Sequence, residues 1–118
     1  MSFSLKTRTM DNVVIFDLSG QLTFGDNVAT FRAAHAAEVA KGHLNFVINL
    51  GHVTHVDSAG LGELIATYVS DRKAHGNVVL LNLTARIKDL LQMTKLLTVF
   101  QSFTDEVQAI EAAKLGAS

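Results

Sequence analysis

The chain has no cysteine, no proline and no tryptophan among its 118 residues. Without cysteine it can form no disulfide, and it has neither a thiolate nucleophile nor a thiolate metal ligand. Without proline, glycine must supply most of the turns between elements. No apolar run is longer than four residues, which excludes a transmembrane helix and direct membrane insertion. The net charge of -1 leaves no excess of positive charge for nucleic-acid binding.

The remaining composition is typical of a globular domain. Hydrophobic residues make up 48% of the chain and charged residues 18%. A chain of this length suits one domain, residues 1–118, with a buried core of its own. Its N-terminal segment lacks the apolar stretch of a signal peptide, so we expect a cytoplasmic protein.

Five short segments have the pattern of β-strands. Their residue ranges are 3–9, 13–18, 46–50, 78–81 and 97–100. Asp11 and Asn12 are a turn signal between the first two segments and predict a β-hairpin. The third and fourth segments are mostly apolar, which indicates strands covered on both faces. Residues 51–56 are expected to be a connection.

Four segments have apolar residues at helical spacing. Two of the expected helices span residues 27–41 and 61–72, and two more begin after residues 84 and 104. The expected N-caps are Asp26, Thr84 and Thr104, and the expected helix ends are Gly42 and Gly76. The expected inward side chains are Val28, Phe31, His35, Val39, Leu61, Leu64, Ile65, Tyr68, Val69, Arg72, Ile87, Leu90, Leu91, Val107 and Ile110.

The predicted order of elements is β-β-α-β-α-β-α-β-α. Strands that alternate with helices imply a mostly parallel sheet, because a crossover helix returns each strand in the same direction. The sequence therefore predicts a single-domain α/β fold with a mixed sheet, an N-terminal antiparallel hairpin and about four helices.

A candidate site follows the third predicted strand, in the DSAGLG loop of residues 57–62. Loops at the carboxyl ends of parallel strands are where α/β proteins place their sites. Ser58 is expected at or near the N-cap of the next helix, where free N–H groups and the helix dipole tolerate a phosphate. Gly60 and Gly62 lower helix stability and would allow another surface to approach the backbone closely. Alternatively, Asp57 and Ser58 are only helix caps and the glycines only shape a tight turn.

The sequence near this loop does not supply the positioned base or the motif that a catalytic serine needs. A nucleophilic Ser58 would need an adjacent base, and a short loop gives no reason to aim His52 or His55 at it. The G-x-S-x-G elbow of hydrolases is absent because Val56 stands at its first position. We therefore expect no catalytic residue and no enzyme activity.

Metal and nucleotide sites are not favoured either. His52 and His55 would lie on opposite faces of an extended segment, which does not favour a metal site with His43 or Asp57. A phosphoacceptor Asp57 would need Mg²⁺ held by several carboxylates, and the second strand offers only Asp17. Since the chain also has no glycine-rich phosphate loop, we expect no metal and no cofactor.

As a whole, the pattern resembles a stand-alone STAS domain, the fold of bacterial anti-sigma factor antagonists. The segments that carry the resemblance are residues 14–22, 46–50, 53–62, 87–100 and 105–109. The stretch VTHVDSAGLG, residues 53–62, matches the hallmark loop of the family, and the other segments agree in order and spacing. The resemblance covers nearly the whole chain.

The resemblance implies a phosphorylation switch. In this family the serine of the D-S-x-G loop, here Ser58, is phosphorylated by a partner that is both a serine kinase and an anti-sigma factor. The unphosphorylated antagonist binds that partner and so releases the sigma factor, and a PP2C-type phosphatase reverses the modification. Phosphorylation adds a charge of about -1.5 to -2, which would weaken binding without refolding the domain.

The partner is expected to contact the loop and the exposed face of the following helix. That face, off the apolar stripe, is predicted to include Glu63, Thr67 and Asp71. The predicted partner-binding residues are Asp26, Asp57, Ser58, Ala59, Gly60, Gly62, Glu63 and Thr67. The alternative is that the polar residues of this helix form only a solvated face.

The TFGD segment, residues 23–26, departs from the family pattern. Many antagonists have an acid after the G-x-L of the second strand, where this chain has Thr23. Asp26 is a candidate to replace that acid. The segment is more similar to STAS domains attached to anion transporters, so the alternative function is a scaffold or transporter-associated subunit without phosphoregulation.

Overall fold

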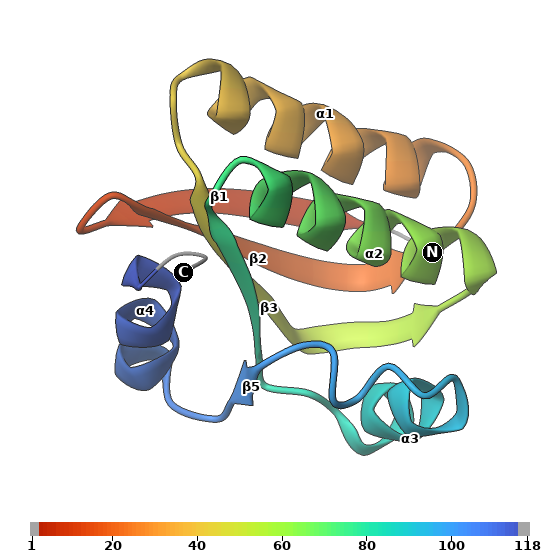
Figure 1. The fold of residues 1–118 in the computed structure, drawn as a ribbon. Coiled ribbons are helices and arrows are strands. Elements are labelled where there is room, and N and C mark those ends of the chain that lie inside the picture. Colours follow the sequence, from red (N-terminus) through yellow and green to blue (C-terminus); the bar gives the residue numbers. More distant parts are fainter. Residues whose placement is uncertain (1–2, 116–118) are drawn as a thin grey trace.

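A five-stranded sheet, in the strand order β1-β2-β3-β4-β5, forms the centre of the computed structural model, which describes residues 3–115 (Figure 1). The strands are β1 (Ser4–Met10), β2 (Val13–Leu22), β3 (Asn45–Val56), β4 (Asn77–Leu81) and β5 (Ser102–Phe103). The helices are α1 (Asp26–Ala40), α2 (Ser58–Lys73), α3 (Ala85–Met93) and α4 (Glu106–Lys114). β1 is antiparallel to β2, and the later neighbours are parallel. The predicted element order and mixed α/β sheet are confirmed.

The β1–β2 hairpin follows from its two turn residues. Asp11 and Asn12 have φ angles of 52° and 66°, as the central residues of a type I′ turn require. Asp and Asn tolerate this left-handed region better than most other residues that have a Cβ. The turn joins Met10 directly to Val13 and so sets the register of the hairpin.

Helices cover both faces of the sheet, and each face has its own apolar cluster. α1 and α2 lie side by side on one face, and α4 lies on the other (Figure 1). The first face buries Val14, Phe16, Phe46, Ile48 and Leu80 under Phe31 of α1, Leu64 of α2 and Ile87 of α3. The second face buries Val13, Ile15, Val47, Val79 and Leu81 under Ala109, Ile110 and Ala113 of α4. Burial on both faces explains why β3 and β4 contain nearly continuous apolar runs.

β2 and β3 are longer than their sequences indicate. Residues 51–56, predicted to be a connection, form the second half of β3 and pair with residues 19–22 of β2. The register shifts twice, after Asp17 and after Gly20 of β2, so β3 carries extra residues there as bulges. The β-branched Val53, Thr54 and Val56 suit a strand, and pairing with β2 keeps the stretch extended. The extension places Asp57 and Ser58 at the surface, while Ala59 and Leu61 still pack against the apolar core.

Two predicted N-caps are wrong by one residue, and the predicted ends Gly42 and Gly76 lie just past the C-caps Lys41 and Ala74. Gly25, not Asp26, is the N-cap of α1. Its φ of 103° suits glycine, and Asp26 lies in the first turn, where its charge complements the helix dipole. Asp105, not Thr104, caps α4 and accepts a hydrogen bond from the N–H of Val107.

The last strand and two inward side chains also differ from the prediction. β5 is Ser102–Phe103, and residues 97–100 form turns instead of a strand. Val39 and Val107 are exposed although their spacing predicts burial. In α1 the buried position belongs to Glu38, whose carboxylate is held by Lys41 and His43 at 3.0 Å each. A buried polar contact has therefore replaced the apolar one that the spacing indicated.

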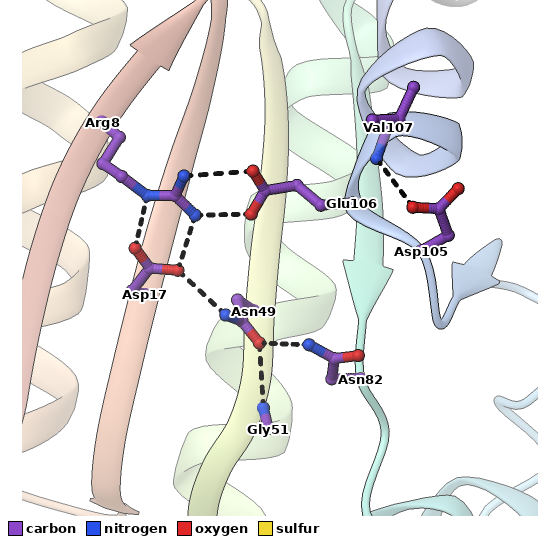
Figure 2. A network of polar contacts seen from close by, with 8 residues as sticks. All are labelled: Arg8, Asp17, Asn49, Gly51, Asn82, Asp105, Glu106 and Val107. Atoms are coloured by element: carbon purple, nitrogen blue, oxygen red, sulfur yellow. Dashed lines mark hydrogen bonds and ion pairs between the residues drawn. The ribbon is translucent and has the colours of Figure 1, made fainter.

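A polar network attaches α4 to the hairpin (Figure 2). Arg8 donates to both carboxylate oxygens of Asp17, at 2.6 and 3.1 Å, and to both oxygens of Glu106, at 2.7 and 3.1 Å. Asn49 donates to Asp17 at 2.9 Å, which extends the network to β3. The hydrogen bonds from Arg8 are the main reason that the pKa values of Asp17 and Glu106 lie below their ordinary values.

We expect Arg8→Met to lower the free energy of unfolding at neutral pH by about 1 kcal/mol, because these groups are partly exposed to solvent. Carboxylates with a depressed folded pKa stabilise the protein above their unfolded pKa, and this contribution is lost as the pH falls through the folded pKa. Wild type and variant should therefore converge in stability in acid. Urea denaturation at neutral and acidic pH measures this, and a difference independent of pH would contradict the assignment.

Candidate functional site

The loop of residues 57–62 lies at the carboxyl end of β3 and opens α2. Asp57 is the N-cap: its backbone is extended, with φ -92° and ψ -175°, and its Oδ1 accepts a 2.9 Å hydrogen bond from the N–H of Gly60. Ser58 is the first residue of the helix and is exposed. The expected position of Ser58, at or near the N-cap, is confirmed, and Asp57 is the cap itself.

The carboxylate of Asp57 also joins two loops. Its Oδ2 accepts a 2.9 Å hydrogen bond from the N–H of Phe24, in the turn between β2 and α1. Hydrogen bonds from the N–H groups of Phe24 and then Gly60 hold the pKa of Asp57 below its ordinary value. Asp57 is therefore an ionised positioning group that fixes both loops beside Ser58.

Gly60 and Gly62 differ in whether packing within the domain requires glycine at that position. A Cβ on Gly60 would lie 2.0 Å from the carbonyl oxygen of Leu22 and 3.1 Å from Cγ1 of Val56, so the start of α2 packs directly on the end of β2. A Cβ on Gly62 would meet nothing within 4 Å. Packing inside the domain thus requires glycine at position 60 and leaves position 62 open to solvent.

The predicted exposed face of α2 is partly wrong. Thr67 is 3% exposed and Asp71 is 1% exposed, on the side of the helix that packs against α1. Val69 and Arg72, which the apolar spacing predicts to be inward, are exposed. The prediction oriented α2 toward the sheet alone, whereas its buried surface is shared between the sheet and α1. Thr67 is therefore not available for direct contact with a partner.

The other residues proposed for partner binding lie around this helix start. Ala59 is half-buried and packs against the main apolar cluster, which fixes the first turn of α2. Glu63 is half-buried and accepts from Arg32 of α1 at 2.8 Å. Asp26 is exposed in the first turn of α1. The N–H groups of Phe24 and Gly60 donate to Asp57, and a role for Asp26 in place of the acid missing at Thr23 stays a prediction.

A buried histidine–carboxylate pair joins α1 to α2. Nε2 of His35 lies 2.8 and 3.0 Å from the carboxylate oxygens of Asp71, and the His35 ring packs on Phe46 with 4.7 Å between ring centroids. Burial raises the pKa of Asp71, and the hydrogen bond from His35 opposes that rise. This pair explains the burial of a charged residue that the helical pattern assigned to solvent.

Phe24 is a site residue that the sequence did not single out. Its side chain is 83% exposed, and its backbone is tied to Asp57 next to Ser58. The sequence feature that could have indicated Phe24 is its position: a large apolar residue between Thr23 and Gly25, outside any strand or helix pattern that would bury it.

His52 and His55 lie in the second half of β3, where the strand is bulged. His52 and His55 line the same depression of about 540 Å³, with Thr84 and Arg86 on its other side. A bulge at Thr54 lies between the two histidines, so the regular alternation of faces that the prediction assumed does not hold there. The Nδ1 of His55 lies 3.1 Å from the hydroxyl of Thr54. Across residues 3–115, no three His, Asp or Glu side chains are grouped in a way that suits a metal ion.

The chain matches the family model of the STAS domain over residues 4–109. BtrV of Bordetella bronchiseptica, which is named an anti-sigma factor antagonist, is 27% identical over 105 residues, or 89% of this chain and 90% of that protein. None of the helices within residues 3–115 has the length and apolar character needed to cross a bilayer.

Solved structures with similar folds include other proteins of this name. TM1081 of Thermotoga maritima superposes with a TM-score of 0.86 at 22% identity, covering 93% of this chain and 94% of the other. SpoIIAA superposes in its unphosphorylated form with a TM-score of 0.73 at 20% identity, covering 96% and 98% of the two chains. The phosphorylated form of Bacillus SpoIIAA has a TM-score of 0.71 at 22% identity, covering 94% and 98%.

Proposed function

Because the chain belongs to the STAS domain family and its relative BtrV is named an anti-sigma factor antagonist, we propose that it is a binding module switched by phosphorylation of Ser58. Unphosphorylated, it captures a serine kinase that is also an anti-sigma factor, and the sigma factor is released. Phosphorylated, it no longer binds that kinase, until a PP2C-type phosphatase removes the phosphate.

The exposed hydroxyl of Ser58 at the start of α2 is the observation that carries this proposal. A kinase needs an accessible hydroxyl, and this one lies at the surface between two ordered loops. The neighbouring carboxylate, Asp57, has a lowered pKa and accepts two backbone N–H groups. It is therefore a poor general base for Ser58, so the kinase must supply the catalytic groups.

The same geometry favours loss of binding on phosphorylation. The N–H group of Gly60, in the first turn of α2, already donates to Asp57, so a phosphate on Ser58 gains less from the helix than it would at an uncapped start. It would instead add a charge of about -1.5 to -2 beside the Asp57 carboxylate, on the surface that the partner covers. Ser58 is outside the apolar core, so the modification changes the surface and leaves the fold intact.

Labelling and binding with the purified serine kinase/anti-sigma factor of the same organism test the proposal. With ATP, wild type should be phosphorylated at Ser58 and Ser58→Ala should not. With ADP, Ser58→Ala should bind like wild type, and Ser58→Glu should bind at least about tenfold more weakly, a change of about 1.4 kcal/mol. Ser70→Glu, an exposed serine on the same helix, is the matched control and should bind normally.

Equal phosphorylation of wild type and Ser58→Ala would rule out the switch. The alternative function is a scaffold or transporter-associated STAS subunit, which the Thr23–Asp26 segment favours and in which Asp57 and Ser58 serve only the helix start. Unchanged partner binding by Ser58→Glu, with recovery of a transporter subunit and no kinase, would support that alternative.

A further inference from the structure

One large aromatic side chain stands exposed beside the Ser58 loop. Phe16, Phe31, Phe46 and Phe100 are buried, and Phe3 and Phe103 are half-buried, whereas Phe24 is 83% exposed. Leaving such a side chain in water forgoes about 1.5–3 kcal/mol of burial energy. Among residues 3–115, Phe24 belongs to neither of the two apolar clusters.

The position of Phe24 is fixed from both sides. Its N–H donates to Asp57 at 2.9 Å, and Gly25, which follows it, has a φ of 103° that a residue with a Cβ rarely adopts. The turn is therefore ordered before any partner arrives. With its backbone already held, an aromatic residue has only two side-chain torsions to fix on binding, which favours its use as an anchor.

The face of α2 that carries Ser58 is open at one position, Gly62. Ser58 and Gly62 are four residues apart and so share a face of α2. Glycine in a helix costs about 1 kcal/mol relative to alanine, and the open space around Gly62 gives no reason for it inside the domain. A second protein that packs closely over this turn would supply the reason.

We propose that Phe24, Ser58 and Gly62 form one contact patch, in which Phe24 inserts into an apolar pocket of the kinase/anti-sigma partner and Gly62 provides clearance. This inference rests on the function proposed above. The occupant is that partner and not a second copy of the chain, because a symmetric dimer through this patch would cover the hydroxyl that the kinase must reach. A phosphate on Ser58 would then stand beside the apolar anchor, where desolvating it is costly.

Binding of the purified kinase/anti-sigma factor in the presence of ADP, measured by calorimetry, tests the patch. Phe24→Ala should weaken binding about 30-fold, corresponding to the 2 kcal/mol typical of an interface hot spot. Its thermal unfolding should be unchanged, because the ring is exposed. Met93→Ala is the matched control: Met93 is 81% exposed on α3, outside the patch, and the variant should bind like wild type.

Gly62→Gln tests separately whether the partner must approach the backbone of α2 closely at position 62. The variant should be at least as stable as wild type and bind at least about tenfold more weakly, since glutamine favours the helix more than glycine does. If wild type binds and Ser58→Glu does not, but Phe24→Ala and Gly62→Gln both bind like wild type, the patch is wrong and the switch stands. If wild type fails to bind the kinase, both the switch and the patch are overturned.

Discussion

Replacing Gly60 by alanine is expected to lower the free energy of unfolding by about 3 kcal/mol or more, whereas the same replacement at Gly62 raises it by up to about 1 kcal/mol. The added Cβ at position 60 would lie 2.0 Å from the carbonyl oxygen of Leu22, so α2 must move away from the end of β2. At position 62 the methyl group enters open space, and only the better helix propensity of alanine remains.

Urea denaturation of the two single variants and wild type measures both effects. The pair is internally controlled, because the helix, the turn and the substitution are the same and only the surroundings of the new methyl group differ. The Gly60→Ala variant should also displace Ser58 and Asp57, which begin the same turn. Similar stability changes of the same sign at both positions would contradict the close approach of α2 to β2.

Removing His35 is expected to have an effect of similar size. Replacing it by leucine should lower the free energy of unfolding by about 3–5 kcal/mol, because Asp71 then remains as a buried carboxylate without its partner. Both side chains are almost fully enclosed, at 11% and 2% exposure, so water cannot replace the lost hydrogen bond. The double variant His35→Leu/Asp71→Leu should regain most of the loss, since it leaves no unpaired charge.

The pH dependence of the His35→Leu variant has a defined sign. Burial raises the folded pKa of Asp71, and the hydrogen bond from His35 is what opposes the rise. Without His35 the pKa of Asp71 should rise further. A carboxyl group with a raised folded pKa stabilises the protein below its unfolded pKa and loses that contribution as the pH rises through the folded value.

The destabilisation by His35→Leu should therefore be largest at neutral pH and shrink as the pH is lowered and Asp71 becomes protonated. Urea denaturation of wild type, His35→Leu and the double variant over a pH series measures this. The double variant should not show the effect. A penalty that stays the same at every pH would mean that Asp71 is neutral already, and a penalty near zero would remove the pair from the α1–α2 contact.

Several features of the fold were predictable because their causes are local. Asp11 and Asn12 predict a tight hairpin turn through the left-handed conformations that they tolerate. The apolar runs of β3 and β4 predict strands covered on both faces, and Thr84 caps α3 as expected. The DSAGLG loop was placed correctly at the junction of β3 and α2.

Features that depend on a neighbour from elsewhere in the chain were not predictable. Residues 51–56 were predicted to be a connection although Val53, Thr54 and Val56 suit a strand, and only their pairing with β2 shows that they continue β3. Thr67 and Asp71 are buried because α1 covers that side of α2 and His35 gives Asp71 a partner. Helical patterning assigns polar residues to the solvent-exposed face, so it gives the wrong orientation for a buried pair of polar residues.

The features of the candidate site also divide into those with local causes and those that depend on residues far apart in the sequence. The sequence by itself placed Ser58 at or near the start of a helix, since capping chemistry depends on a few adjacent residues. Only the tertiary structure decided that Gly60 contacts Leu22 while Gly62 faces solvent, and that Asp57 holds Phe24 beside Ser58. Those relations join residues that lie far apart along the chain, and they exist only once β2 and α2 are packed together.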